Sequence, residues 1–363
     1  MHAAALIAQI KQREPEARIS GFGGDRMEAS GCRIVRHIRY TAFMGFAAVI
    51  SHWRDVKDNF RIARNALLNE HPDVLVLIDY PSFNMQIAAF YRRHLPQIRI
   101  VWYIPPKVWA WKKWRIHRMA RLCDEILGIF PFEPAFYAQY GYRCTYVGHP
   151  TVESIQQAKP VLQCNDLTGE AGLTVQRSVL ALLPGSRPSE ISHCLPRMLE
   201  AARRFPDCHI VVCAASGIED TFYQSYLHPQ ETLTRDTYAT LQSAAAAVVN
   251  SGTATLEAAL IGCPQVAVYH LALSRLIGLL RWAQPLFFAI PYFTPVNIIA
   301  GKEIIKECIA NDFTADKVAA ELNRLLKDEA YKKELLAQYE QLRSVLGTQS
   351  ASSTAADIIT SIP

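Results

Sequence analysis

The sequence has no CxxC pair, no GxxxxGK[ST] or GxGxxG motif, and no large surplus of either charge. Its nine cysteines are odd in number and scattered, so they indicate neither a zinc knuckle nor a disulfide framework and favour a reducing, cytoplasmic interior. Lys and Arg outnumber Asp and Glu by 38 to 33. A surplus this small does not indicate a nucleic-acid-binding protein, although it would suit a weakly anionic partner or surface.

No apolar stretch is both long and uninterrupted. The longest, residues 271–293, contains Arg275, Arg281 and two prolines, so we do not expect it to cross a bilayer. Two interpretations remain open for it: a segment in the interfacial plane of a membrane, or a buried core helix or dimer contact. The opening segment MHAAALIAQIKQREPEARI has neither a basic start nor a cleavage site, and it predicts a helix instead of a signal peptide.

The composition that is present belongs to a folded protein of 363 residues, half of them apolar and a fifth charged. This length favours two domains. Short β-branched runs alternate with amphipathic stretches in both halves, which predicts two α/β domains with doubly wound parallel sheets facing one cleft. A polar stretch over 148–176 predicts a boundary near residue 160, between an N-terminal domain at 1–160 and a C-terminal domain at 161–340.

Ligands of such sheets bind at the carboxyl ends of the strands. Three segments that follow predicted strands are candidates for such a site. In DVLVLIDYPSFN, Asp79 follows a buried strand and is delivered to the sheet edge. Desolvation there would raise its pKa toward the range of a general base. The alternative is that Asp79 only caps the following helix.

The other two segments have features suited to phosphate. In LLPGSRPSEI, Gly185 permits close backbone approach, the next helix start offers free N–H groups, and Ser186 and Arg187 lie beside it. In NSGTATLEAAL, the small residues Ser251, Gly252 and Thr253 leave the amides of a helix start open, and Glu257 follows about one turn later, where it could accept from ribose hydroxyls. An ordinary strand-to-helix turn and simple helix capping are the alternatives.

A fourth segment, YIPPKVWAWKKWRIHRMARL, interleaves three tryptophans with six basic residues. Such a composition can serve single-stranded nucleic acid, a membrane interface or an anionic substrate. Nucleic acid is disfavoured by the small net charge and by the lack of a recognisable module.

Taken together, these segments resemble the lipid-A-disaccharide synthases, a family of inverting glycosyltransferases. The resemblance runs in the family order through GFGGDRMEASGC, FMGF, DVLVLIDYPSFN, YIPPKVWAWKKWRIHRM, FPFEPAFY, YVGHP, LLPGSRPSEI, NSGTATLEAAL and PYFTPVNIIAGKEIIKE. It implies a GT-B fold of two Rossmann-like domains, with a C-terminal helix at 341–363 packing back on the first domain. It also implies transfer from UDP-2,3-diacylglucosamine to 2,3-diacylglucosamine 1-phosphate, giving a β-1,6-linked disaccharide 1-phosphate and UDP.

The resemblance also implies roles for individual residues. Asp79 would be the catalytic base, and Arg187 with the amides near Gly252 would meet the charge of the leaving diphosphate without a metal or other cofactor. Glu257 would hold the uridine ribose and Asn297 would line the cleft. Candidates for contact with the acceptor or the membrane are Asn84, Trp109, Trp111, Lys113, Arg115, Arg118, Arg275 and Arg281. The expected location is cytoplasmic, at the anionic face of the inner membrane, and a homodimer is possible within the family.

Two departures from the family pattern stand out. Members usually begin with a strand and a Gly-Glu-x-Ser-Gly-Asp loop, whereas this chain opens at the following helix, and Ala48 stands where a glutamate often follows MGF. Two other functions therefore stay in view. One is a UDP-sugar epimerase of the same architecture, and the other is a non-catalytic remnant that binds nucleotide or membrane.

Overall fold

The computed structural model describes residues 1–40, 53–110, 113–158, 177–270 and 291–361. Contacts divide the chain into unit 1, made of Met1–Glu153 and Thr348–Pro363, and unit 2, made of Ser154–Gly347. The boundary expected near residue 160 falls outside the described residues, and the contacts divide the chain a few residues earlier. Every strand pair found in either unit is parallel, so the predicted α/β class is confirmed.

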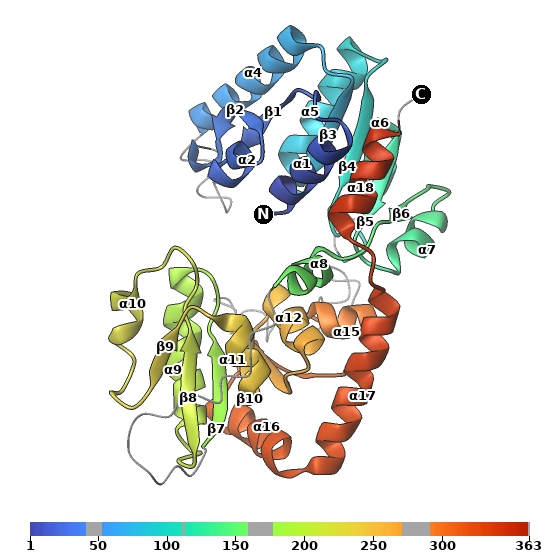
Figure 1. Cartoon of the computed structure of the whole chain (residues 1–363). Helices are drawn as coiled ribbons and strands as arrows, with labels where there is room; N and C mark the ends of the chain where they lie inside the picture. Colours follow the sequence, from blue (N-terminus) through green and yellow to red (C-terminus); the bar gives the residue numbers. More distant parts are fainter. Residues whose placement is uncertain (41–52, 111–112, 159–176, 271–290, 362–363) are drawn as a thin grey trace. The chain divides into compact units, whose positions relative to one another are not determined.

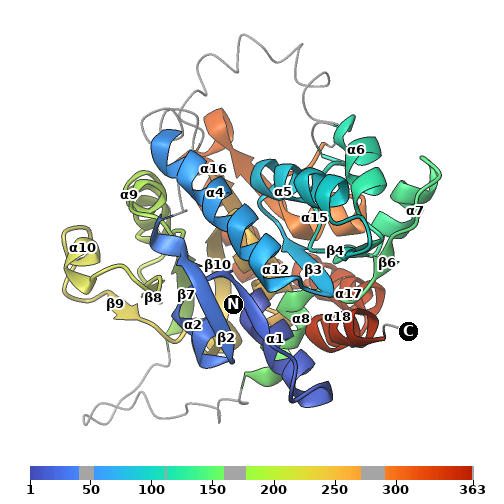
Figure 2. The ribbon, with the colours of Figure 1, turned by 90° about the horizontal axis from the view of Figure 1, so that it is seen from above.

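Unit 1 contains two parallel sheets. Strands β1 (Ile19–Gly23) and β2 (Cys32–His37) form one, and β3 (Val74–Ile78), β4 (Arg99–Tyr103), β5 (Glu125–Gly128) and β6 (Thr145–Tyr146) form the other in that order. The helices are α1 (His2–Arg13), α2 (Asp25–Ala29), η1 (Ile38–Tyr40), α4 (Trp53–Glu70), α5 (Pro81–His94), α6 (Arg115–Leu122), α7 (Glu133–Ala138), the start of α8 (Pro150–Gln157) and α18 (Ala351–Thr360). Figure 2 shows α4 and α5 running beside each other.

The larger sheet of unit 1 is covered on both faces, because alternate residues of β4 point to opposite sides. Ile100 and Trp102 pack with α5 and α6, whereas Val101 and Tyr103 pack with α1 and α18. All four are fully buried or nearly so. Helices on both faces are what a strand of uninterrupted apolar residues requires.

The C-terminal helix α18 belongs to unit 1 and lies against α1, as Figure 1 shows. Arg13 of α1 donates to the Asp357 carboxylate at 2.6 Å. Glu153 of α8, which is buried, accepts from the Ser352 amide at 2.9 Å and from the Ser352 hydroxyl. The expected range of 341–363 is thus divided: residues up to Leu346 continue a helix of unit 2, and α18 alone packs in unit 1.

Unit 2 has a single six-stranded sheet in the order β12-β11-β10-β7-β8-β9. The strands are β7 (Ser178–Leu183), β8 (Cys208–Cys213), β9 (Thr232–Thr234), β10 (Ala244–Asn250), β11 (Gln265–Tyr269) and β12 (Lys306–Ile309). The helices are α9 (Pro188–Ala202), α10 (Asp220–Gln224), α11 (Thr237–Ser243), α12 (Thr253–Ile261), α15 (Pro295–Ala300), η3 (Ala310–Asp312), α16 (Ala315–Lys327) and α17 (Glu329–Leu346).

The strand order of unit 2 identifies where a ligand should bind. From β7 the chain moves outward through β8 and β9, then returns to the other side of β7 and continues outward through β10, β11 and β12. The strand order therefore reverses between β7 and β10. In doubly wound sheets the binding crevice opens at the carboxyl ends of the strands at such a point.

Two further findings concern the described residues only. None of their helices combines the length and apolarity needed to cross a membrane. Their cysteines are all free thiols.

Candidate active site

The candidate site of unit 1 lies where β3 ends. Asp79 and Tyr80 both have left-handed backbones, with φ of 46° and 44°, and Ile104 at the end of the neighbouring β4 has φ of 57°. Residues with side chains rarely adopt this conformation, and such strain concentrates at functional sites. The Asp79 amide donates to the Ile104 carbonyl at 3.2 Å, so a backbone hydrogen bond connects the two strained segments.

Asn84, on the first turns of α5, fixes this conformation. Its Nδ2 donates to the Ile78 carbonyl at 3.1 Å and to the Asp79 carbonyl at 2.6 Å. Pro81 occupies the first position of α5, where its missing N–H costs nothing. Asn84 was expected to contact the acceptor, but both amide hydrogens are engaged in holding the backbone that carries Asp79.

The Asp79 side chain is exposed in unit 1, so the desolvation expected for it is not present in the structure. The basic group near it is Lys107. Burial lowers the pKa of Lys107, and the carboxylates of Asp79 and Glu133 partly oppose that effect. The Lys107 ammonium also lies 5.7 Å from the centre of the Phe130 ring.

Glu133, which is fully buried at the start of α7, connects the turn after β5 to the segment between β4 and α6. It accepts hydrogen bonds from the Trp109 indole at 3.0 Å, from the Ile129 amide at 2.8 Å and from the Phe130 amide at 2.9 Å. Burial raises its pKa to about 7 despite these bonds. Trp109 is only 4% exposed and packs edge-on against Phe130, so its indole is part of the core and not a free membrane contact.

The remaining aromatic and basic candidates of unit 1 are at the surface. Trp114 is 63% exposed, and the Arg115 guanidinium lies 5.6 Å from its ring centre. Lys113 and Arg118 are exposed as well. Trp111, Arg275 and Arg281 lie outside the described residues.

The candidate site of unit 2 begins at the turn after β7. Gly185 has φ of 119°, and a Cβ there would come within 2.7 Å of Glu190 Oε2 and 2.8 Å of Asn250 Nδ2. Only glycine fits this conformation and this space. Glu190, in the first turn of α9, accepts from the Ser186 amide at 3.1 Å and from Arg187 at 3.0 Å. Glu190 thereby orients the Arg187 side chain, which is 56% exposed.

The second turn of unit 2 follows β10, the neighbour of β7. The Ser251 amide donates to the Val268 carbonyl at 2.7 Å, which ties this turn to β11. A Cβ at Gly252 would meet no atom within 4 Å, so the chain is open to space at the start of α12. Helix starts of this kind favour anions.

Glu257 lies on α12, just over one turn beyond Thr253. The Tyr238 hydroxyl of α11 donates to Glu257 Oε1 at 3.4 Å. Burial raises the pKa of this carboxyl, and the tyrosine bond opposes that effect.

Asn297 does not join this site. Its side chain is fully buried, and its Nδ2 donates to the Ile305 carbonyl and to Glu307, each at 2.9 Å. Its Oδ1 accepts from the amides of Ile304 at 2.7 Å and Ile305 at 3.0 Å. Two donors and two acceptor positions are all that an amide possesses, so none is left for a ligand.

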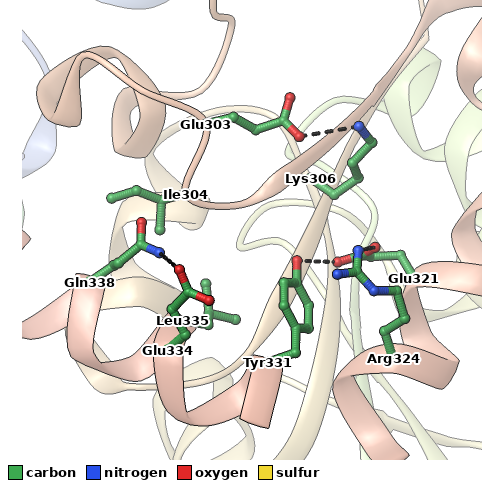
Figure 3. Close-up of a pocket in the computed structure, with 9 residues that line it drawn as sticks. All are labelled: Glu303, Ile304, Lys306, Glu321, Arg324, Tyr331, Glu334, Leu335 and Gln338. Atoms are coloured by element: carbon green, nitrogen blue, oxygen red, sulfur yellow. Dashed lines mark hydrogen bonds and ion pairs between the residues drawn. The ribbon is translucent and has the colours of Figure 1, made fainter. Parts of the chain in front are cut away.

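A cavity of about 310 Å³ lies elsewhere in unit 2, between the start of β12 and helices α16 and α17 (Figure 3). Its charges are paired with one another: the Tyr331 hydroxyl donates to Glu321 at 2.6 Å, and Lys306 lies 3.1 Å from Glu303. Parallel pairing aligns Lys306 with Val266, near the amino end of β11. The cavity is therefore at the opposite end of the strands from the two turns.

In the described part of each unit, the carboxyl end of the sheet thus carries a surface suited to chemistry. Unit 2 brings together all the predicted donor-site residues except Asn297, and unit 1 presents Asp79. Sequence reasoning missed Glu190 and Asn250. Glu190 is the third residue after the N-cap Arg187, a position from which a glutamate commonly accepts backbone hydrogen bonds at a helix start, so it could have been identified.

The chain was compared with known proteins. A family model described as lipid-A-disaccharide synthetase matches residues 1–359. A lipid-A-disaccharide synthase of Geobacter sulfurreducens is 33% identical over 370 residues, covering 99% of this chain and 93% of that protein. One of Koribacter versatilis is also 33% identical, covering 98% and 93%.

Solved structures show the same fold at low identity. The glycotransferase of kitacinnamycin has a TM-score of 0.61 at 15% identity and covers 98% of this chain and 94% of its own. A putative UDP-N-acetylglucosamine 2-epimerase from Listeria monocytogenes has a TM-score of 0.64 at 12% identity, covering 99% and 92%. Glycosyltransferases of the GT-B type and epimerases thus share this architecture.

Proposed function

The chain belongs to the lipid-A-disaccharide synthase family, and from that premise we propose that it joins two acylated glucosamines. The donor is UDP-2,3-diacylglucosamine, and the acceptor is 2,3-diacylglucosamine 1-phosphate. The observation that carries this proposal is the match of family model and relatives over nearly the whole chain. The chemistry below assigns residues of this chain to the reaction.

Asp79 is the general base in this proposal. Its carboxylate takes the proton of the acceptor 6-hydroxyl while that oxygen forms a bond to C1 of the donor sugar. The bond between C1 and the diphosphate oxygen breaks on the opposite face, so the configuration at C1 inverts and UDP leaves. The support is an exposed carboxylate on a backbone that Asn84 holds in one conformation. A base must be fixed within hydrogen-bond reach of its proton.

The diphosphate binds at the two turns of unit 2. Arg187, oriented by Glu190, and the open start of α12 at Gly252 supply positive charge and N–H groups where negative charge develops. Both turns flank the point where the strand order reverses. Glu257 is assigned to the ribose hydroxyls, because an acceptor one helical turn from the phosphate site suits a vicinal diol.

We further propose that the protein acts at the cytoplasmic face of the inner membrane, where its acylated substrates reside. The exposed Trp114, flanked by Arg115, Arg118 and Lys113, supports this location. Flotation with anionic vesicles at low salt should recover the protein, and a Trp114→Ser/Arg118→Ser double variant should be recovered less. Equal recovery of both proteins would remove this segment from the interface.

The proposed base is tested with Asp79→Asn and a matched control, Asp73→Asn, at the other end of the same strand. Removing a general base should lower kcat by about 10²- to 10⁴-fold, while UDP affinity stays within about twofold. Asp73 is exposed, and its backbone carbonyl accepts from the Arg99 amide at 3.3 Å, a bond that the substitution leaves in place, so its variant should keep wild-type turnover. Normal turnover by Asp79→Asn would refute the assignment.

The epimerase alternative is separated by product analysis. A UDP-sugar epimerase would convert a non-acylated donor without an acceptor, whereas the synthase requires both acylated sugars. The structural similarity to epimerases is at 12% identity and shows only the fold. The family match favours the transferase.

A further inference from the structure

Two histidines and an arginine meet in unit 2, outside the residues assigned above. His193 and Arg197 lie one turn apart on α9, and His270 follows the last residue of β11. The two imidazole rings are stacked, with centroids 4.5 Å apart and planes 12° from parallel. The Arg197 guanidinium lies 3.3 Å from His270 Nδ1.

These contacts define the protonation of the rings. An arginine can only donate, so His270 Nδ1 is the acceptor and the ring is neutral, with its hydrogen on Nε2. His193 Nδ1 donates to the Ser189 carbonyl at 2.6 Å. The His270 ring can therefore take up a proton on Nδ1, which would place a second positive charge beside that of Arg197.

No carboxylate balances this group within the described residues. The titratable groups that share its face of α9 are Glu190 and Cys194, and Glu190 is already bonded to Arg187 and Ser186. Burial, His193 and Arg197 all lower the pKa of His270, and no acid raises it. The Arg197 guanidinium otherwise lies 5.3 Å from the centre of the Phe313 ring, and the carboxylate of the preceding Asp312 is paired with Lys317.

The cluster also lies at the carboxyl end of the strands, the end of the sheet to which the proposal assigns the donor. Cys194, next to His193, is 3.5 Å from Asn250 Oδ1 at the end of β10. Parallel pairing aligns Asn250 with Val268, so His270 follows two residues beyond that partner on the neighbouring strand. An anionic ligand held at the two turns therefore has the Arg197 guanidinium and the two imidazoles on the same side of the sheet end.

We propose that His193, Arg197 and His270 form a phosphate site in which binding is coupled to uptake of a proton by the stacked imidazoles. A dianion would supply the negative charge that the cluster lacks, and it would accept hydrogen bonds from Arg197 and from a protonated ring. The natural ligand, a phosphate of one of the two sugar substrates, rests on the proposed function. The coupling itself does not.

The first experiment uses the full chain with ¹³C-labelled histidine and sulfate as the probe. Sulfate does not titrate between pH 6 and 8, so any pH dependence of its affinity belongs to the protein. Sulfate should shift the signals of two histidines and bind about tenfold more tightly at pH 6 than at pH 8, as one linked proton allows. Unshifted signals, or an affinity independent of pH, would overturn the proposal.

Variants identify the residues. His270→Gln should remove the pH dependence of sulfate binding, and Arg197→Gln should weaken sulfate binding about tenfold or more at both pH values. His228→Gln, which replaces an exposed histidine of the same unit, is the matched control and should behave as wild type. Retained pH dependence in both His193→Gln and His270→Gln, in samples with wild-type thermal unfolding, would overturn the assignment.

A last set of titrations separates the two substrates and the two proposals. UDP and glucosamine 1-phosphate are added in turn, and the probe that shifts the two histidine signals at the lower concentration carries the natural phosphate. One outcome would overturn the inference and keep the donor site: UDP binds, Arg187→Ala weakens that binding, and neither UDP nor glucosamine 1-phosphate shifts the histidine signals. A sulfate response without any UDP binding would keep the inference and overturn the donor site.

Discussion

The turns to which the proposal assigns the two halves of the reaction are built in opposite ways. At the end of β3, unit 1 forces Asp79 and Tyr80, both with full side chains, into the left-handed region. At the end of β7, unit 2 uses Gly185 for the same region, and at the end of β10 it uses Gly252, which adopts an extended φ in open space. A general base acts through its side chain, which a strained backbone can hold in one direction. A phosphate is bound by backbone N–H groups, which it reaches most closely where the residue has no side chain.

The largest effect in this comparison should come from adding one methyl group to the unit 2 turn. Gly185→Ala combines a positive φ with overlap against Glu190 and Asn250, and should cost about 3 kcal/mol of unfolding free energy. UDP affinity should fall in parallel. Gly252→Ala, at an extended φ of 164° and with no neighbour within 4 Å, should leave stability within about 0.5 kcal/mol. Calorimetric scans and UDP titrations of both variants check the pair, and equal stability losses would contradict it.

A comparable effect in unit 1 should appear as a pH dependence. Burial raises the pKa of Glu133 to about 7, above its unfolded value of 4.5, so the folded state holds this proton more tightly. Its contribution is complete below pH 4.5 and is lost as pH rises through 7, amounting to about 3 kcal/mol. Glu133→Gln should remove that dependence. Chemical unfolding at pH 5 and pH 8 measures this change in unfolding free energy. The same change in the variant as in the wild type would show that another group causes it.

Asn84→Ala tests whether the strained backbone of unit 1 serves the base. Loss of both bonds to the Ile78 and Asp79 carbonyls should let Asp79 move, and kcat should fall about 10- to 100-fold. KM for the acceptor should change little, whereas the loss of a substrate contact would raise it. Steady-state kinetics with saturating UDP-sugar separate the two constants. Partial recovery of kcat in Asn84→Gln is the matched control.

The comparison also shows what could be predicted from sequence. The positions of Asp79 and Gly185 just after strands could be predicted, because apolar runs ending in polar or glycine residues mark strand ends, and that signal is local. Asn297 was expected to contact a ligand, yet its four hydrogen bonds reach residues of the following loop and strand, which no local pattern reveals. The stacking of the His193 and His270 rings depends on the order of the strands in the sheet, so no local sequence pattern predicts it either.

The smallest effect should distinguish strain from side-chain loss at Tyr80. This ring is 46% exposed and lies 6.0 Å from that of Phe83, so Tyr80→Ala and Tyr80→Gly both lose this contact. Only the glycine variant also relieves the left-handed φ, and it should be more stable than the alanine variant by about 1 kcal/mol. If strain exists to aim the base, the more stable glycine variant should nevertheless turn over no faster than the alanine variant. Thermal unfolding and kcat measured on the same samples give both quantities, and a glycine variant that is both more stable and faster would show that this strain does not serve catalysis.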